Sequence, residues 1–575
     1  MQTSVYALSL LPLIGLAACQ ADGFQAEERT GQDIAEDVLT ARFDSFTYEG
    51  TVPDGLPEPE AGQYRNPVLS GFYPDPSITK GEDAYYLVTS TFAYFPGLPV
   101  FRSTDLVNWE QVGNVIDRPG MLDFDGLGLS RGVFAPTIEY EDGTYYVANT
   151  CVDCGGNFIV TAEDPAGPWS DPIWLPEVGG IDPSVFFDED GKVYVINNDA
   201  PEGEPRYEGH RAIWIREVDP ETFQSISEPQ VLLDGGVRPE ENPIWIEGPH
   251  IYNIDGRYYL WAAEGGTAVN HSQVVLRSDD VLGPYVPYED NPILTQRHLP
   301  ADRPNPITSV GHADLVQDDE GGWWATFLGV RPYEGDTYNT GRETFLMPVR
   351  WEDGWPVMVQ GDEQVPYVAD RPALPEGEAP SVPISGSFTL GEDLEGPLEP
   401  YWMTVRVPDE DWYAVEDGAL VIEARDERLG DKAQPSVLVR RQQHRSAAAQ
   451  TEMTFTPRDS GDEAGLLVMQ SDEYYYALGL GLDEAGEPVV RLRRRAGPGM
   501  DERGEVIAST AYEGAPGAPL DLRIAADDGD YDFAFRPAGG EWQVIEEDAD
   551  GTILSTRVAG GFVGATFGMY AEGGE

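Results

Sequence analysis

Five short segments with the same pattern recur along the first two thirds of this 575-residue chain. Each has an acidic or glycine-containing turn, followed by an aromatic and β-branched run that is typical of a β-strand. Repeats of this kind limit the possible folds strongly, because each unit has to bury one face against its neighbours. The segments are 81–90, 142–150, 190–198, 255–263 and 321–328.

A second short strand precedes each segment at a nearly constant distance, and these strands begin at Asp75, Ala135, Asp182, Glu247 and His312. The five positions are 60, 47, 65 and 65 residues apart, which leaves room for four strands per unit. No helical periodicity lies between them. Four-stranded units without helices are typical of a β-propeller. We therefore predict an all-β chain with a five-bladed β-propeller over residues 63–362.

The inner strands of a propeller line a central channel, so equivalent residues of different blades form a ring. This ring brings together Asp75, Asp182, Glu247, His312 and Ala135. Taken alone, Asp75 or Asp182 could equally be an Asp-Pro cap at a strand end. Glu247 is different, because it follows the apolar run 243–246, where a buried carboxylate is costly unless it has a partner or a task.

Two carboxyl groups with different pKa values are what glycoside hydrolysis needs, one as the acid and one as the base or nucleophile. Two neighbouring anions and apolar surroundings raise the pKa of Glu247, which suits a general acid. We expect Asp75, on a solvated segment, to stay ionised as the general base. Asp182 would then keep Glu247 protonated and oriented.

The motifs around these residues resemble those of glycoside hydrolase family 43. They are YPDPS at 73–77, GIDPS at 180–184 and EGPH at 247–250, supported by further matches between residues 66 and 360. The resemblance implies a β-xylosidase or an α-L-arabinofuranosidase with Asp75 as base, Asp182 as pKa modulator and Glu247 as acid. It also implies inversion at the anomeric carbon, with no cofactor required for the chemistry.

The same resemblance assigns five residues to the sugar pocket. Phe92 and Phe134 would form apolar walls, Thr267 would lie beside them, and Arg342 would bind hydroxyl groups. For the two phenylalanines, packing between blades is the alternative. His312 would lie under the substrate, and either hydrogen-bonds there or contacts a hydrated Ca²⁺ in the channel. One imidazole is a minority ligand for such a hard cation.

The repeat stops after the propeller, and residues 363–385 are rich in Pro, Glu and Gly, which is typical of a linker. Alternating apolar runs then predict an antiparallel β-sandwich over residues 386–575. RRQQH at 440–444 and EAGL at 463–466 resemble the concanavalin-like, jelly-roll sandwich of family xylosidases, which closes one side of the active-site pocket.

An apolar run at residues 5–18 ends in LAAC at 16–19, which resembles a bacterial lipobox in which Cys19 becomes acylated. An ordinary cleaved signal peptide is the alternative. We read residues 1–19 as an export signal and the acidic residues 20–62 as a tether. Both readings place the protein outside the cytoplasm of a bacterium, as a periplasmic protein or an outer-membrane or cell-surface lipoprotein.

Cys151 and Cys154 form the remaining Cys-x-x-Cys pair. Zinc would need two further ligands at a compatible spacing, and the chain has no second pair. A local disulfide or two structural thiols are therefore the favoured interpretations, and none of these makes the cysteines catalytic.

The formal net charge of -66, from 102 acidic against 36 basic residues, argues against nucleic acid as a partner, since phosphates would be repelled. The partners we expect are an oligosaccharide and, through a lipid on Cys19 only, a membrane. The function we predict is exo-acting β-xylosidase on xylo-oligosaccharides. The alternatives are an α-L-arabinofuranosidase acting on arabinoxylan or arabinan side chains, and a carbohydrate-binding propeller without catalysis.

Overall fold

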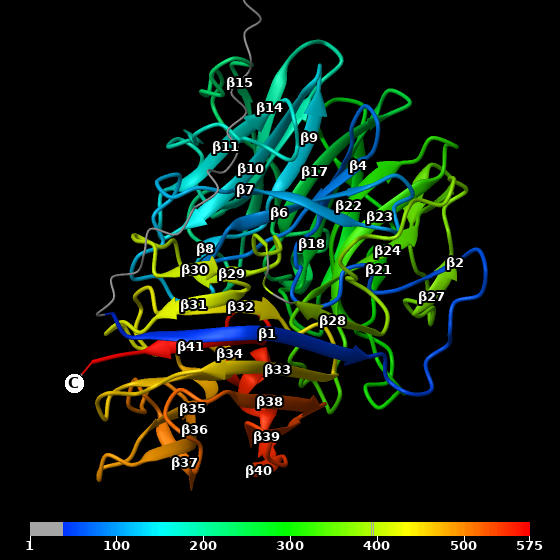
Figure 1. The fold of residues 1–575 in the computed structure, drawn as a ribbon. Coiled ribbons are helices and arrows are strands. Elements are labelled where there is room, and N and C mark those ends of the chain that lie inside the picture. The colour runs from blue at the N-terminus through cyan, green and yellow to red at the C-terminus, as the bar shows by residue number, and fades with distance from the viewer. Residues whose placement is uncertain (1–37, 393, 395, 575) are drawn as a thin grey trace, which may run out of the picture. The chain divides into compact units, whose positions relative to one another are not determined.

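The computed structural model describes residues 38–392, 394 and 396–574, and nearly all regular structure in them is β-strand (Figure 1). The helices of this part are the short segments η1 (Pro239–Glu241), η2 (Gly551–Leu554) and α1 (Thr556–Ala559). The all-β prediction is confirmed. In the described part of the chain, no helix is long and apolar enough to cross a membrane. The predicted signal segment with Cys19, and residues 20–37, lie outside the described residues.

Five antiparallel sheets follow one another along the chain and form the five predicted blades. The first contains β3 (Ser77–Lys80), β4 (Tyr85–Val88), β6 (Gly97–Ser103) and β7 (Glu110–Ile116), and the second contains β8 (Gly132–Val133), β9 (Thr137–Glu141), β10 (Thr144–Val152), β11 (Gly156–Ala162) and β12 (Ile173–Trp174). The third contains β13 (Ile181–Phe187), β14 (Val193–Asp199), β15 (Ala212–Val218) and β16 (Gln230–Asp234). The fourth contains β17 (Glu247–Ile254), β18 (Arg257–Glu264), β19 (Ser272–Ser278), β20 (Val286–Pro287) and β21 (Leu294–Thr295), and the fifth contains β22 (Thr308–Gln317), β23 (Trp323–Val330) and β24 (Glu343–Pro348).

The predicted strand pairs are hairpins in all five blades, from β3 with β4 to β22 with β23. Their first strands contact one another in the order β3, β9, β13, β17 and β22, and β22 contacts β3 again. The ring is therefore closed. At the closure, the buried carboxylate of Asp314 accepts hydrogen bonds from the Ser77 hydroxyl at 2.6 Å and the Ile78 N–H at 2.9 Å.

The fifth blade differs from the expected four strands, because its sheet contains three. Its outer strand β24 exchanges hydrogen bonds with the segment before the first blade: the Leu69 and Thr344 amides each bond the other residue's carbonyl at 3.2 Å. Next to this segment, β2 (Gln63–Arg65) pairs with β27 (Val368–Asp370). The predicted linker 363–385 thus contains a strand that pairs with the segment before the first blade. β25 (Arg350–Glu352) and β26 (Trp355–Val357) form a separate hairpin.

The predicted sandwich consists of two antiparallel sheets of eight strands each. One contains β1 (Thr40–Thr51), β28 (Phe388–Glu392), β30 (Tyr413–Glu416), β31 (Ala419–Glu423), β33 (Ser446–Thr454), β38 (Leu520–Asp527), β39 (Asp530–Pro537) and β40 (Gln543–Asp550). The other contains β5 (Tyr94–Phe95), β29 (Met403–Val405), β32 (Val437–Arg441), β34 (Glu463–Ser471), β35 (Tyr474–Leu482), β36 (Pro488–Ala496), β37 (Glu505–Ala511) and β41 (Thr566–Glu572). Since β5 lies between β4 and β6 of the first blade in sequence, the propeller contributes an edge strand to the sandwich.

The tether prediction for 20–62 is wrong over residues 40–51, which form β1 inside the sandwich. The dark blue β1 runs among the yellow to red strands in Figure 1 and pairs with β33, β31 and β28. Ala41, Phe43, Phe46 and Tyr48 are fully buried in the sandwich core, between half-buried polar residues. A register shift between Phe43 and Ser45 interrupts the alternation, which hides the strand pattern in an acidic sequence.

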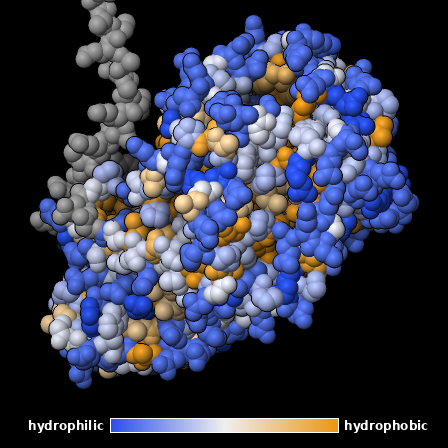
Figure 2. Space-filling model, turned by 90° about the vertical axis from the view of Figure 1, so that its right-hand side faces the viewer, coloured by the Kyte–Doolittle hydropathy of each residue, from blue (hydrophilic) through white to orange (hydrophobic). Residues whose placement is uncertain are grey.

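The propeller and the sandwich meet closely at Gly341 and Gly564. A Cβ on Gly341, whose φ is +76°, would lie 2.9 Å from the Gly564 Cα, so larger residues do not fit this junction. The Ala565 N–H donates to the Asn339 carbonyl at 2.7 Å nearby. Hydrophilic side chains cover most of the face seen in Figure 2, in line with the acidic composition.

Candidate active site

All eight predicted site residues lie on the wall of one cavity of about 730 Å³, together with Ala135. The ring of equivalent positions predicted from the repeat is therefore confirmed as a structural arrangement. The predicted residues are Asp75, Phe92, Phe134, Asp182, Glu247, Thr267, His312 and Arg342.

The backbone at the ring positions is unusual. Asp75, Asp182 and His312 have φ values of 54°, 54° and 52°, in the left-handed region that non-glycine residues seldom adopt. Register shifts interrupt the strand pairing after Ile181, Glu247 and Gly311. Such bulges redirect a side chain away from the regular pleat, and left-handed residues carry about 1–3 kcal/mol of strain each. Both features coincide at Asp182 and His312, so two blades use the same local device to direct a ring side chain.

Asp75 is buried, with 4% of its surface exposed, which corrects the expectation that it lies on a solvated segment. Its carboxylate accepts hydrogen bonds from Arg342 Nη1 at 2.8 Å, Arg342 Nη2 at 3.3 Å and the Ser90 hydroxyl at 2.7 Å. Burial raises the pKa of Asp75, but Arg342, His312 and Ser90 together outweigh it and hold the pKa below its ordinary value. Asp75 is therefore ionised because of a buried cation.

Asp182 and Glu247 are buried without such a cation. Burial, and then the charge of Asp75, raises the pKa of Asp182, whose Oδ2 accepts a hydrogen bond from the Gly248 N–H at 3.2 Å. Burial, followed by the charges of Asp182 and Asp75, raises the pKa of Glu247 well above its ordinary value. These are the causes expected from the sequence. The cavity therefore combines an ionised carboxylate with a carboxyl group that holds its proton.

Gly248, between Glu247 and the rest of β17, has a φ of +55°, and a Cβ there would lie 2.7 Å from His312 Nε2. The EGPH motif thus needs glycine at this position, because any side chain would displace His312 or the backbone that carries Glu247.

His312 lies with Nδ1 3.8 Å from Asp75 Oδ1, and burial lowers its pKa to about 4. It is a neutral imidazole near the Asp75 carboxylate. The side chains of the described range do not form a calcium site by themselves, since they contain no group of three or more His, Cys, Asp or Glu that could hold a metal ion. His312 would supply one nitrogen to a cation that prefers oxygen, so its imidazole alone is a poor ligand for Ca²⁺.

Three phenylalanine rings form the apolar wall, and one of them comes from the sandwich. The Phe92 ring lies 5.4 Å from that of Phe134 and 5.8 Å from that of Phe562, while the last two lie 5.5 Å apart. Sequence reasoning predicted that the sandwich closes the pocket but did not identify Phe562, which follows α1 after two glycines. The phenylalanines also pack in the core between blades, so both interpretations of Phe92 and Phe134 hold.

Arg342 has a second role besides the predicted contact with sugar hydroxyl groups. Both of its terminal nitrogens bind Asp75, and the guanidinium carbon lies 5.8 Å from the Phe92 ring centre and 5.4 Å from that of Phe562. Its Nε is buried and has no hydrogen-bond partner among the described residues. Thr267 is half-buried in the loop between β18 and β19.

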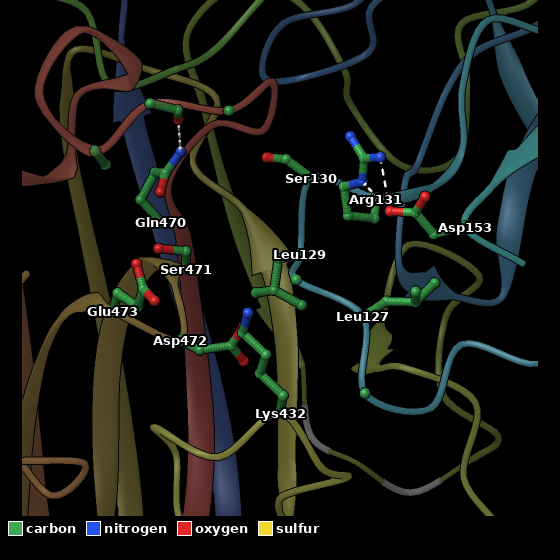
Figure 3. Close-up of a pocket in the computed structure, with 15 residues that line it drawn as sticks. Leu127, Leu129, Ser130, Arg131, Asp153, Lys432, Gln470, Ser471, Asp472 and Glu473 are labelled. Carbon is green, nitrogen blue, oxygen red and sulfur yellow. Dashed lines mark hydrogen bonds and ion pairs between the residues drawn. The ribbon is translucent and has the colours of Figure 1, made fainter. Parts of the chain in front are cut away.

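A second cavity of about 420 Å³ lies between the propeller and the sandwich (Figure 3). Ser130 and Arg131 of the propeller face Lys432, Gln470 and Asp472 of the sandwich across it. Arg131 also lines the cavity with the carboxyl groups, so the two cavities share part of a wall.

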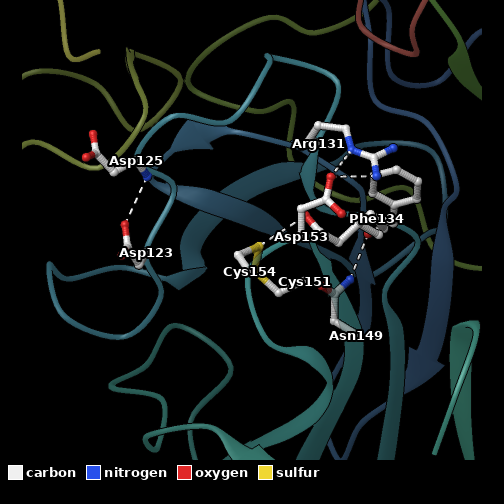
Figure 4. The surroundings of a disulfide bond; sticks show 9 residues. Asp123, Asp125, Arg131, Phe134, Asn149, Cys151, Asp153 and Cys154 are labelled. Atoms are coloured by element: carbon white, nitrogen blue, oxygen red, sulfur yellow. Dashed lines mark hydrogen bonds and ion pairs between the residues drawn. A yellow bond between two sulfur atoms is a disulfide. The ribbon is translucent and has the colours of Figure 1, made fainter. Parts of the chain in front are cut away.

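The Cys-x-x-Cys pair is a disulfide, Cys151–Cys154, at the end of β10 (Figure 4). Asp153, inside this small loop, accepts a hydrogen bond from Arg131 Nε at 2.7 Å. The Arg131 guanidinium carbon in turn lies 5.9 Å from the centre of the Phe134 ring. The local-disulfide interpretation is confirmed, and the disulfide belongs to the structure that supports the cavity wall.

This arrangement can perform acid–base chemistry. An ionised carboxylate can accept a proton from water, and a buried protonated carboxyl group can donate one to a leaving oxygen. The hydrolysis of a glycosidic bond uses both steps.

Comparison with known proteins agrees with this chemistry. The model of glycosyl hydrolases family 43 matches residues 64–356. The chain belongs to this family. A beta xylosidase C-terminal concanavalin A-like domain matches residues 394–575, which is the sandwich. The protein is thus a family 43 glycoside hydrolase, and the alternative of a propeller without catalysis is wrong.

Its relatives carry names of two activities. A xylosidase/arabinosidase of Butyrivibrio fibrisolvens is 38% identical, with 88% of this chain and 95% of the relative covered. A non-reducing end alpha-L-arabinofuranosidase of Bacteroides ovatus is 37% identical, with 89% and 91% covered. Among solved structures, a GH43_12 protein from a capybara gut metagenome has a TM-score of 0.85 at 39% identity, covering 93% of this chain and 100% of that one.

Proposed function

We propose that this family 43 enzyme is an exo-acting β-xylosidase that releases xylose from xylo-oligosaccharides in one inverting displacement. The observation that carries the proposal is the contrast inside one cavity between Asp75, ionised by Arg342, and Glu247, which holds its proton. Both roles of a single-displacement glycosidase are then available at the same time.

In this mechanism the Glu247 carboxyl donates its proton to the oxygen of the leaving sugar. Asp75 accepts a proton from a water molecule, which attacks the anomeric carbon from the opposite side. Asp182 keeps the Glu247 pKa high through its charge and binds the Gly248 N–H at 3.2 Å, next to Glu247. The three phenylalanine rings exclude bulk water from the side of the sugar, and Arg342 and His312 bind its hydroxyl groups.

An α-L-arabinofuranosidase is the second candidate. The names of the Butyrivibrio and Bacteroides relatives support it, and the same three carboxyl groups would serve this reaction. A bifunctional enzyme would combine the two.

We also propose that the protein is exported and, more specifically, that Cys19 carries a lipid. The apolar run 5–18 before Cys19 supports export, as does the Cys151–Cys154 disulfide, since such bonds persist in oxidising compartments. Labelling of cells with a radioactive fatty acid tests it: we expect label on the wild type and none on Cys19→Ser, while label on neither protein contradicts the lipid.

Early proton NMR of xylobiose with the purified enzyme tests the main proposal. We expect α-xylose as the first product, before mutarotation. Initial β-xylose would contradict inversion. Intact xylobiose together with cleavage of an α-L-arabinofuranoside would replace the proposal by the second candidate.

A further inference from the structure

Trp245 and Arg211 lie on the wall of the same cavity as the three carboxyl groups. Neither residue takes part in the proposed proton transfers. The Arg211 guanidinium carbon lies 4.1 Å from the centre of the Trp245 ring, a short cation–π contact. Both side chains are half-buried. Trp245 precedes the proposed acid Glu247 by two residues, so the pair stands next to the group that protonates the leaving oxygen.

The backbone around this pair is held in place from several sides. Trp245 has a left-handed φ of 52°, and its N–H donates to the Gly209 carbonyl at 2.8 Å. The Tyr207 hydroxyl donates to the Pro243 carbonyl at 2.8 Å, and the Gly265 N–H donates to the Ile244 carbonyl at 2.9 Å. Three loops are thus pinned together, which presents the indole in one orientation before any ligand binds.

Arg211 differs from the other two arginines of the cavity. Arg342 binds Asp75 and Arg131 binds Asp153, whereas Arg211 forms no ion pair within the described part of the chain. Its hydrogen bond goes to the His210 carbonyl at 3.2 Å. In a chain with 102 acidic residues, an arginine that meets only a carbonyl and an aromatic face keeps most of its donors for a ligand.

A pyranose ring is a ligand that matches this pair. Sugar sites combine an aromatic face, against which the C–H groups of the ring pack, with donors for the hydroxyl oxygens. We propose that Trp245 and Arg211 form the subsite for the leaving pyranose, with the indole against its ring and the guanidinium bound to its hydroxyl oxygens. This inference rests on the proposed β-xylosidase function and names the residues that select an oligosaccharide leaving group.

The test compares two substrates with the same xylosyl group. Xylobiose has a pyranose leaving group, whereas β-D-xylosyl fluoride releases fluoride, which cannot use the subsite. We expect Trp245→Ala and Arg211→Gln to lower kcat/KM for xylobiose by about tenfold, as for the loss of a stacked aromatic contact. The loss on the fluoride should be several times smaller, and Trp245→Phe should recover part of the activity on xylobiose.

A matched control is available at Arg277 and Trp355, where the guanidinium carbon lies 4.0 Å from the ring centre outside the cavity. Arg277→Gln removes a similar contact and should change neither substrate. Arg211 lowers the pKa of Glu247, so Arg211→Gln should also shift the alkaline limb of the pH profile upward, which Trp245→Ala should not.

Equal losses on both substrates would overturn the inference, since they would mean that the pair only supports the fold. An unchanged rate on xylobiose in both variants would overturn it as well. If the wild type hydrolyses neither substrate, the proposed function fails first and the inference falls with it, so the two failures are told apart.

Discussion

Glu247 of the propeller and Glu463 of the sandwich are both buried glutamates on strands, with 7% and 0% of their surfaces exposed. Glu463 accepts hydrogen bonds from Arg493 Nε at 2.7 Å, from the Tyr570 hydroxyl at 2.6 Å and from Arg491. Burial raises the pKa of Glu463, but Arg493 and Arg491 more than offset this and lower it. Glu247 has two acidic neighbours instead, and its pKa is raised well above the ordinary value.

The comparison shows that burial alone does not decide what a carboxyl group does. In the sandwich, cations fix the charge and the carboxylate holds strands together. In the described part of the propeller, Arg342 is the one arginine that forms an ion pair with a carboxylate of the ring, and it binds Asp75. Glu247 therefore keeps a proton that it can donate. The proposed catalytic glutamate and the structural glutamate thus differ in where the arginines lie.

The largest effect should follow from Glu247→Gln, which removes the donated proton but keeps the shape. We expect kcat/KM on xylobiose to fall by about 10²–10⁴-fold, the usual contribution of a general acid. Binding of xylobiose, measured by calorimetry, should remain. A wild-type rate in this variant would contradict the role of Glu247.

Glu463→Gln should act on stability instead, because it leaves Arg491 without its carboxylate partner and leaves Arg493 with Glu572 alone. Removing one partner of a buried ion pair costs about 3–5 kcal/mol. Urea unfolding measures the loss, with Glu247→Gln as the matched control that should not show it. If the two variants lose the same stability, the distinction between the two glutamates is wrong.

Much of the propeller could be predicted from the sequence, because five blades repeat one hairpin at nearly constant spacing and the repeat itself marks the ring positions. The strand β1 could not, since a register shift breaks the alternation of Phe43 and Phe46 and the charged residues between them look like a tether. The completion of the fifth blade by Leu69 is also not local, because its partner Thr344 lies at the other end of the domain.

The sequence predicted which residues form the candidate site better than it predicted their burial and their partners. The ring gave the acids and the histidine, and the resemblance to the family gave the phenylalanines and Arg342. The burial of Asp75 was missed because the motif around it looks like an exposed turn, while its partner Arg342 lies 267 residues away. Phe562 was missed because it belongs to no repeat and reaches the cavity through tertiary packing alone.

Arg342→Met would make Asp75 more like Glu247, by removing its cation. The pKa of Asp75 should then rise, and the acidic limb of the kcat/KM profile should move to higher pH by about 1–3 units, the usual effect of a close opposite charge. An acidic limb that stays in place would show that another group is the base.

The pH dependence of stability should have opposite signs in the two regions. The raised pKa of Glu247 favours folding below its ordinary value of 4.5, and this contribution is lost as the pH rises through the raised value. The lowered pKa of Glu463 contributes above 4.5 and is lost as the pH falls through the lowered value. We therefore expect Glu247→Gln to gain Tm relative to the wild type as pH rises, and Glu463→Gln to lose less Tm in acid. Parallel Tm curves of both variants would contradict this.

The smallest expected effect concerns the solvent-exposed carboxylates that both the propeller and the sandwich carry. With a net charge of -66, added NaCl should screen the repulsion between exposed carboxylates and raise Tm. The difference in Tm between the Glu247 and Glu463 variants should change little with salt, because buried pairs are screened less. A Tm that stays flat or falls up to the salinity of seawater would contradict the screening.

Infrared difference spectroscopy tests most directly where the proton lies. At a pH about one unit above the ordinary carboxyl pKa, the wild type minus Glu247→Gln spectrum should contain the C=O band of a protonated carboxyl group. The wild type minus Glu463→Gln spectrum should contain the bands of an ionised carboxylate. If the protonated band persists in Glu247→Gln and disappears in Asp182→Asn, the proton lies on Asp182, and Glu247 is not the acid.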